Sequence, residues 1–319
     1  MINLHLPTYK APKVLFNGHL QTIVPALTRK IVVPFQYARE RIVTPDDDFL
    51  DLDWLASDQK KLIILNHGLE GNSSRPYIFG MAVHLFQQGY DVLAWNYRGC
   101  SGEMNRAKRM YHSGATDDLD FVIQHASKKY DAISLVGFSL GGNLTLKYLG
   151  EQKAATPIKC ALTFSVPLDL HDGVKYLDQG LNRLYAKRFL GTLFDKVKQK
   201  HTQYPDLIDL DAMKQIKSLF DFDDTYTSKL HGFSGAVDYY TQCSSINFID
   251  TIAIPTLIVN AKNDPMIGRI ALQEGIAEGL SKVQFHLEAE GGHCGFSRGQ
   301  NQPYWSEEVA VRFLNEFMS

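Results

Sequence analysis

The pentapeptide Gly137-Phe138-Ser139-Leu140-Gly141 separates two runs of different character. Residues 132–136 before it are apolar and rich in strand-forming types, whereas residues 142–149 after it have a helical pattern. A sharp strand-to-helix turn here would hold the Ser139 hydroxyl at the tip of a strand, facing the N-terminus of the helix. Gly137 and Gly141 are small enough for the close backbone approach in such a turn. The stretch therefore predicts a strand, a tight turn that presents a serine, and a helix.

Short apolar runs alternate with helical patterns along much of the chain. Apart from the run before Ser139, they lie at residues 62–65, 92–95, 161–164, 256–259 and 283–287. Apolar strands separated by helices indicate an α/β fold, with a mostly parallel sheet covered by helices on both faces. Residues 35–56 predict a hairpin that turns at residues 45–48, and residues 306–318 predict a final helix that packs on the sheet.

The alternation stops between Asp169 and Ile252. This segment has amphipathic runs at residues 181–198 and 211–220 and no clear strand. We predict a helical cap at residues 169–252, inserted over the carboxyl edge of a sheet built from residues 1–168 and 253–319, because ligands bind at that edge in open α/β folds.

Composition excludes several classes of protein. The 319 residues are 45% hydrophobic and include 33 basic and 35 acidic residues, a net charge of −2, which gives no electrostatic footprint for nucleic acid. The four cysteines are scattered, without the paired spacing of a zinc site or a disulfide framework. The N-terminus lacks the pattern of a signal peptide, and no run is long enough to span a membrane. We expect a soluble cytoplasmic protein with no metal and no cofactor.

A serine hydroxyl needs a base and an orienting acid to become a nucleophile at neutral pH. His293, within Gly291-Gly292-His293-Cys294-Gly295, follows the apolar run at 283–287, and flanking glycines allow its loop to reach toward Ser139. Asp264 follows the run at 256–259 and precedes Pro265, which disfavours helix there. The chain order Ser139, Asp264, His293 therefore predicts a catalytic triad.

Simpler interpretations exist for each partner. Asp264 alone is typical of a turn aspartate that bonds its own backbone, and His293 alone could be a surface histidine. Asp169 is a rival acid, since it follows the run at 161–164. We favour Asp264 over Asp169 because Asp264 lies in the tighter turn after its strand.

Two backbone N–H groups are needed to stabilise the oxyanion that such a reaction forms. We predict Leu140, directly after the serine, and Leu69, in the loop Asn66-His67-Gly68-Leu69-Glu70-Gly71 after the run at 62–65. His67 in the same loop is interpreted as a structural residue.

Other motifs are better explained by structure than by chemistry. His112 and Asp117 have the H-x4-D spacing of some acyltransferases, but a helix capped by Ser113 or Thr116 accounts for it better. The acidic run at residues 221–224 lacks the spacing of a calcium loop and is interpreted as a cap or hinge of the insertion. Tyr239, Tyr240 and Cys294 are interpreted as packing residues.

Taken together, these strings resemble the YheT-like branch of the α/β-hydrolases, which is related to several abhydrolase-domain proteins. The resemblance spans the chain from about residue 12. The matching strings lie at residues 17–22, 66–71, 96–101, 112–114, 137–141, 222–224, 230–233, 238–240 and 291–296. The resemblance implies a serine hydrolase for short- to medium-chain acyl esters or acylglycerols, with Ser139, Asp264 and His293 as its triad. Some relatives carry an N-terminal membrane anchor that this chain starts too late to include, so the resemblance implies a soluble member without one.

The expected function is therefore hydrolysis of a small or lipid-like ester through an acyl-enzyme. Two alternatives stay open. An acyltransferase on the same fold would replace water by an alcohol or a thiol, and a non-catalytic α/β-hydrolase would only bind its ligand.

Overall fold

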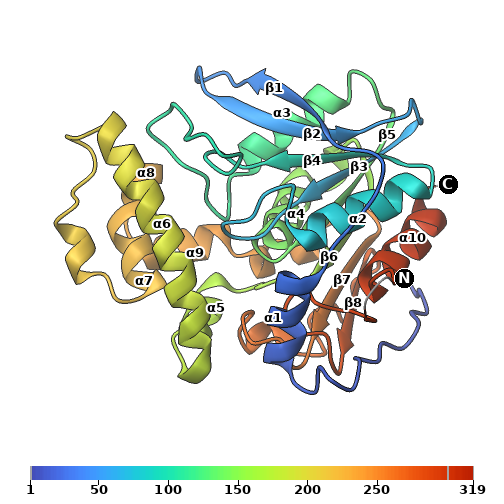
Figure 1. Ribbon diagram of the computed structural model, residues 1–319. Coiled ribbons are helices and arrows are strands. Elements are labelled where there is room, and N and C mark those ends of the chain that lie inside the picture. The colour runs from blue at the N-terminus through green and yellow to red at the C-terminus, as the bar shows by residue number, and fades with distance from the viewer. Residues whose placement is uncertain (1, 300–301, 319) are drawn as a thin grey trace.

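One mixed sheet runs through the molecule, as the computed structural model in Figure 1 shows for residues 2–299 and 302–318. Its eight strands lie in the order β1-β2-β4-β3-β5-β6-β7-β8. β2 is antiparallel to both β1 and β4, and the six strands β3 to β8 pair in parallel with one another. The strands span Ala38–Val43 (β1), Phe49–Leu55 (β2), Lys61–Asn66 (β3), Asp91–Asn96 (β4), Ala132–Phe138 (β5), Ile158–Phe164 (β6), Thr256–Ala261 (β7) and Val283–Glu288 (β8). The α/β fold class, the hairpin and the six predicted parallel strands are confirmed.

Helices cover both faces of the sheet, which explains why its central strands are mostly apolar. In β3, Leu62 and Ile64 pack in one core cluster with α3 and α4, whereas Ile63 packs in a second cluster with α2 and α10. Successive residues of a strand face opposite sides of the sheet. A strand that is buried on both faces therefore lacks the alternation of polar and apolar residues. The helices outside the β6–β7 connection are α1 (Gly18–Thr28), α2 (Pro76–Gln87), α3 (Thr116–Ala126), α4 (Leu140–Gln152) and α10 (Trp305–Phe317).

The connection from β6 to β7 is a helical segment, residues 165–255, all of which the structure describes and none of which forms a strand. Figure 1 shows α6 to α9 gathered at one end of the sheet. The helices are α5 (Leu170–Leu177), α6 (Arg183–Gln203), α7 (Leu219–Phe222), α8 (Ser228–His231) and α9 (Ala236–Cys243). The absence of a strand here agrees with the predicted insertion, whose boundaries at residues 169 and 252 stay a prediction.

Two local predictions differ from the structure. The run at residues 211–220 is not one helix: it holds a 3-10 turn, Ala212–Gln215, and the start of α7, because Ser218 and Asp221 form a capping box that begins a new helix. The predicted side-chain cap of α3 is also wrong. Its N-cap is Ala115, whose side chain offers no acceptor, and the N–H of Ser113 instead donates to the Tyr239 hydroxyl at 2.9 Å.

The helices of residues 2–299 and 302–318 include none with the length and apolar character that a bilayer crossing demands.

Candidate active site

Ser139 sits in the sharp turn between β5 and α4. Its φ of 54° and ψ of −122° lie in a region that non-glycine residues rarely adopt. The turn depends on the predicted glycines: a Cβ on Gly137 would lie 2.6 Å from the Gly141 oxygen, and one on Gly141 would overlap the backbone of Asn66. Any side chain at either position would therefore force the turn open.

His293 links Ser139 to a buried carboxylate. Its Nε2 lies 2.9 Å from the Ser139 Oγ, and its Nδ1 lies 3.1 and 3.0 Å from the two carboxylate oxygens of Asp264. Asp264 is only 1% exposed, and its Oδ1 also accepts the N–H of Met266 at 2.9 Å. On the other side, the N–H of His293 donates to the Thr22 hydroxyl of α1 at 2.9 Å. The structure thus brings together the three residues predicted as a triad.

The charge of Asp264 decides the protonation behaviour of His293. Burial on its own lowers the pKa of this imidazole, but the attraction and hydrogen bond of Asp264 outweigh burial and hold the pKa well above its ordinary value. A raised pKa makes the imidazole a stronger base toward the serine proton.

The residues predicted as oxyanion donors flank Ser139. Leu140 begins α4, so its N–H belongs to the first turn, where helix N–H groups have no partner within the helix. In the loop after β3, the N–H groups of Gly68 and Glu70 each donate to a tyrosine hydroxyl at 2.9 Å, those of Tyr77 and Tyr111. Leu69 lies between these two anchored residues and lines the cavity at Ser139. The roles of Leu69 and Leu140 as oxyanion donors stay a prediction.

The rival residues have structural partners elsewhere. Asp169 caps α5, since its Oδ1 accepts the N–H of Asp172 at 2.9 Å. His67 is fully buried, its Nε2 accepts the N–H of Tyr97 at 3.2 Å, and burial lowers its pKa to about 3. It is therefore a neutral residue that shapes the loop.

The H-x4-D pair and the acidic run also make other contacts. The exposed carboxylate of Asp117 pairs with Arg109 at 2.5 Å. Asp221 closes the capping box of α7, and Asp224 accepts the N–H of Ala236 at 2.8 Å. Within residues 2–299 and 302–318, no group of three or more histidines, cysteines or acidic residues is arranged as a metal site.

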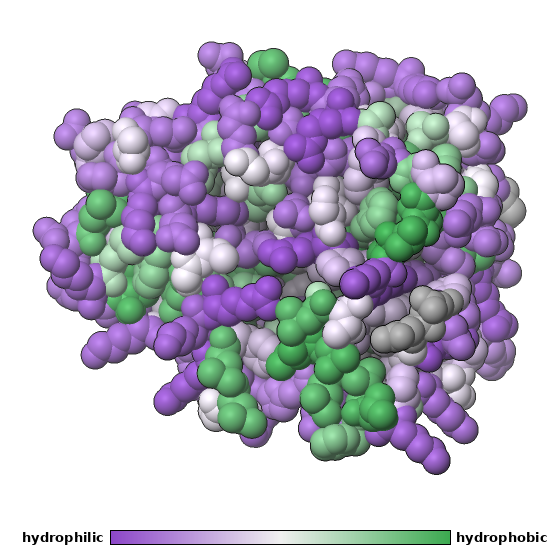
Figure 2. Space-filling model, viewed as in Figure 1, coloured by the Kyte–Doolittle hydropathy of each residue, from purple (hydrophilic) through white to green (hydrophobic). Residues whose placement is uncertain are grey.

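Two pockets meet at Ser139 and His293. Pocket 1 extends under the helical segment, and none of its lining residues is exposed. Pocket 2 extends toward α1 and reaches four exposed residues: Ile23, Ala26, Arg188 and Thr192. Figure 2 shows hydrophobic surface over the region where α1 lies. Pocket 1 is therefore lined by buried and half-buried residues, whereas the lining of pocket 2 includes exposed residues.

Several residues of the site were not predicted from sequence. Lys196 of α6 places its Nζ 2.8 Å from Glu70, the neighbour of Leu69, and so joins the helical segment to the loop after β3. Tyr239 and Tyr240 are buried, as expected of packing residues, but they also line pocket 1 together with Asp223. No local motif marks these contacts, because they join segments far apart in sequence.

Comparison with known proteins defines the family. Residues 61–299 match the α/β hydrolase fold family, so the chain belongs to it. YheT of Escherichia coli (strain K12), an esterase by name, is 34% identical over 95% of this chain and 91% of its own length. Phospholipase ABHD3 of Homo sapiens is 32% identical over 96% of this chain and 78% of its own. The predicted family, and with it the class of ester-hydrolase enzymes, is confirmed.

Solved structures agree on the fold. An esterase of Pyrococcus furiosus superposes with a TM-score of 0.61 at 17% identity, covering 91% of this chain and 97% of that one. Alpha/beta hydrolase domain-containing protein 10 from mouse has a TM-score of 0.57 at 12% identity, covering 88% of this chain and 97% of that one. At such identities the likeness concerns the fold alone.

Proposed function

We propose that this protein hydrolyses carboxylic esters through a Ser139-His293-Asp264 triad and an acyl-enzyme. The observation that carries the proposal is the continuous hydrogen-bond chain from the Ser139 Oγ through both ring nitrogens of His293 to the Asp264 carboxylate. The esterase and phospholipase names of the relatives support the same reaction.

In the first half-reaction, Ser139 Oγ bonds to the ester carbonyl carbon while its proton passes to His293 Nε2. Asp264 stabilises the resulting imidazolium, and the N–H groups of Leu69 and Leu140 donate to the oxyanion. The carbon–oxygen bond to the alcohol then breaks, and the leaving oxygen takes the proton from His293. This leaves an acyl group on Ser139 and a free alcohol.

In the second half-reaction, water replaces the alcohol. His293 takes one proton of the water as its oxygen bonds to the acyl carbon, and returns that proton to Ser139 Oγ as the acyl-oxygen bond breaks. The products are a carboxylic acid and the original enzyme, so the cycle uses no cofactor.

We assign the acyl arm of the substrate to pocket 1 and the alcohol arm to pocket 2. The acyl group stays on Ser139 between the half-reactions and suits pocket 1, whose lining has no exposed residue. The alcohol must leave first and suits pocket 2, whose lining includes exposed residues of α1 and α6. Residues 169–252 act in this proposal as the cap over pocket 1. The leucines and Phe222 that line pocket 1 favour short- to medium-chain acyl esters or acylglycerols as substrates.

We also propose a reducing compartment, which the four unpaired cysteines support, and a substrate other than nucleic acid, which the net charge of −2 supports.

The test measures hydrolysis of p-nitrophenyl acyl esters by the wild type and by Ser139→Ala, together with labelling by a fluorophosphonate probe. We expect turnover and a probe adduct on Ser139 in the wild type only. Equal rates for the two proteins would overturn the proposal. A wild type without turnover or labelling would indicate the binding protein, and acyl transfer to an added alcohol in preference to water would indicate the acyltransferase.

A further inference from the structure

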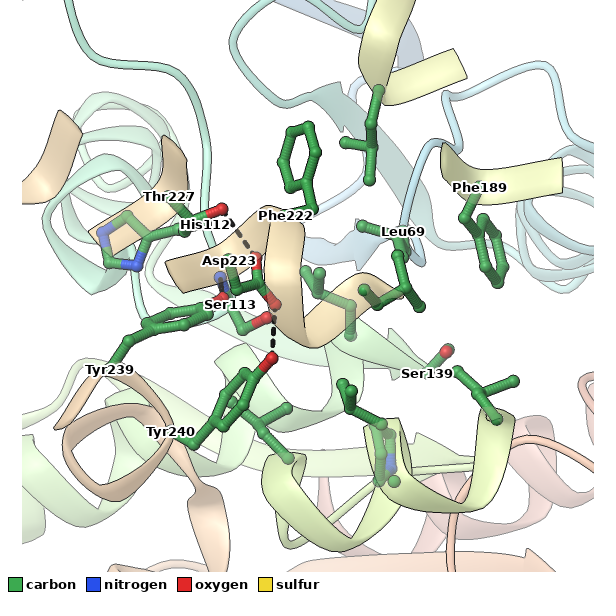
Figure 3. A pocket seen from close by; sticks show the side chains of 18 of the residues that line it. Leu69, His112, Ser113, Ser139, Phe189, Phe222, Asp223, Thr227, Tyr239 and Tyr240 are labelled. Atoms are coloured by element: carbon green, nitrogen blue, oxygen red, sulfur yellow. Dashed lines mark hydrogen bonds between the residues drawn. The ribbon is translucent and has the colours of Figure 1, made fainter. Parts of the chain in front are cut away.

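The far end of pocket 1 is polar, although the pocket between it and Ser139 is mostly apolar. Figure 3 shows this end, where Asp223, Thr227, Tyr240 and His112 meet away from Ser139. We call Asp223, Thr227, Tyr240, His112 and His231 the polar end; all five line pocket 1. A pocket that served only hydrocarbon chains would not need these groups.

The carboxylate of Asp223 is incompletely partnered. It lies in a π-helical turn, Asp223–Thr227, and accepts hydrogen bonds from the hydroxyls of Thr227 at 2.6 Å and Tyr240 at 2.7 Å. A carboxylate has about four acceptor sites, so about two sites remain for other donors. No lysine or arginine of the described residues pairs with it. Burial raises the pKa of Asp223 to about 6, which shows how poorly its charge is compensated.

A second unsatisfied atom lies in the same polar end. His231 Nε2 is buried and has no hydrogen-bond partner among the described residues. Its ring lies against that of His112, with 4.4 Å between the ring centroids. Burial lowers the pKa of His231 to about 4 and that of His112 well below its ordinary value, so both rings are neutral near pH 7. The polar end thus combines a carboxylate with neutral imidazoles.

A hydroxyl group satisfies this arrangement better than the alternatives. Its proton can be donated to Asp223, while its oxygen can accept from the imidazole of His231 in the matching tautomer. A carboxylate would be repelled by Asp223. An ammonium group could pair with Asp223, but it has no acceptor atom for a ring N–H, and it would be repelled by Arg109 and Lys147, whose charges already lower the pKa of His112. A methyl group would leave buried polar atoms without partners.

We propose that the polar end binds a hydroxyl group carried at the far end of the acyl chain, so that hydroxyacyl esters are preferred substrates. This inference rests on the proposed ester hydrolysis and on the acyl arm lying in pocket 1. The apolar wall between Ser139 and the polar end, which includes Leu140, Leu219 and Phe222, accommodates the methylene chain. Chain length then decides whether the hydroxyl reaches Asp223.

The experiment compares kcat/KM for p-nitrophenyl esters that differ only in the terminal group of the acyl chain: methyl, hydroxyl or ammonium. Each set is measured over increasing chain length. In the wild type we expect the hydroxyl ester to be favoured over the methyl ester by on the order of 10- to 100-fold at the length that reaches the polar end. At chain lengths too short to reach the polar end, the wild type should show no preference between the terminal groups.

Asp223→Leu should abolish this preference or invert it, and Asp223→Asn, which keeps an acceptor oxygen, should retain part of it. Asp238→Asn on α9 is the matched control outside the pocket lining and should behave as the wild type. If Asp223→Leu does not fold, His231→Phe tests the same site, since it keeps an aromatic ring and removes Nε2. A methyl or ammonium preference at every length, or an unchanged preference in Asp223→Leu and His231→Phe, would overturn the inference.

Binding to Ser139→Ala separates the two proposals. Calorimetric titration with hydroxyl-terminated and methyl-terminated acyl methyl esters needs no chemistry. If Ser139→Ala binds the hydroxyl-terminated ester more tightly and the wild type cleaves no ester, the polar end is supported and the proposed hydrolysis is overturned. Ester cleavage without any hydroxyl preference, in turnover or in binding, would overturn the polar end alone.

Discussion

The carboxyl edge of the sheet and the helical segment above it build the site in different ways. At the sheet edge, short loops after β5, β7 and β8 hold Ser139, Asp264 and His293, and backbone geometry determines where each side chain points. In the helical segment, residues from separate helical turns meet through contacts between their side chains, as Asp223 and Tyr240 do through a hydrogen bond. The sheet thus positions Ser139, Asp264 and His293, whereas the helical segment shapes what can approach them.

The largest effect should come from the sheet edge. Ser139→Ala removes the proposed nucleophile and should lower kcat for p-nitrophenyl esters by on the order of 10⁶-fold, the loss typical of a triad serine. Binding of ester should remain, since both pockets are intact. Steady-state rates and calorimetric binding to the same protein check both statements. A variant that retained even a tenth of wild-type turnover would show that the sheet edge does not hold the nucleophile.

Asp264→Asn should lower kcat by about 10⁴-fold, because the imidazole loses its orienting charge. The pH profile should also move. Only neutral His293 accepts a proton, so wild-type kcat/KM should rise with pH through the raised pKa of His293, above the ordinary range of a histidine. Without the charge of Asp264, the rise of kcat/KM should occur at lower pH.

Asp169→Asn is the matched control for this carboxylate. Asn still caps a helix, so the cap of α5 survives, and rate and pH profile should stay close to wild type. A larger loss of kcat in Asp169→Asn than in Asp264→Asn would show that the acid of the triad is Asp169, after β6, and not Asp264, after β7.

Lys196→Met tests where the two regions touch. The Lys196–Glu70 pair is mostly buried, with side chains 13% and 6% exposed, so the variant leaves a buried carboxylate beside Leu69. We expect the free energy of unfolding to fall by about 3 kcal/mol and kcat to fall as the oxyanion loop loosens. Lys198→Met, which removes an exposed pair on the same helix, should change the unfolding free energy by less than about 1 kcal/mol. Denaturant titration of both variants measures the difference.

The last effect leaves the reaction untouched and concerns the stability of the protein as pH changes. The pKa of Asp223 is raised from 3.8 to about 6, so the folded protein binds this proton more tightly than the unfolded chain. The group contributes stability that is fully present below pH 3.8 and is lost as pH rises to about 6, by up to about 3 kcal/mol. Unfolding free energies at pH 4 and pH 7 should therefore differ less in Asp223→Asn than in the wild type. An identical difference would show that Asp223 is well compensated, and would weaken the polar end as a binding site.

The sequence was informative where function depends on a local turn. Gly137 and Gly141 are required by contacts within a few residues of Ser139 or across one strand pair, so the pentapeptide is visible in the chain. Asp264 and His293 were found because each follows an apolar strand. The cap predicted for α3 was wrong because Ser113 contacts Tyr239, a residue more than a hundred positions away.

The sequence by itself determined the order of strands and helices and the chemical types of the reacting residues, because periodicity and glycine turns are local properties. Only the tertiary structure decided that Asp264 rather than Asp169 meets His293, that Lys196 holds the loop of Leu69, and that Asp223 lines the same pocket as Ser139. These contacts join distant segments through packing of the helical segment on the sheet edge. Packing distances depend on the whole fold, and no spacing along the chain records them.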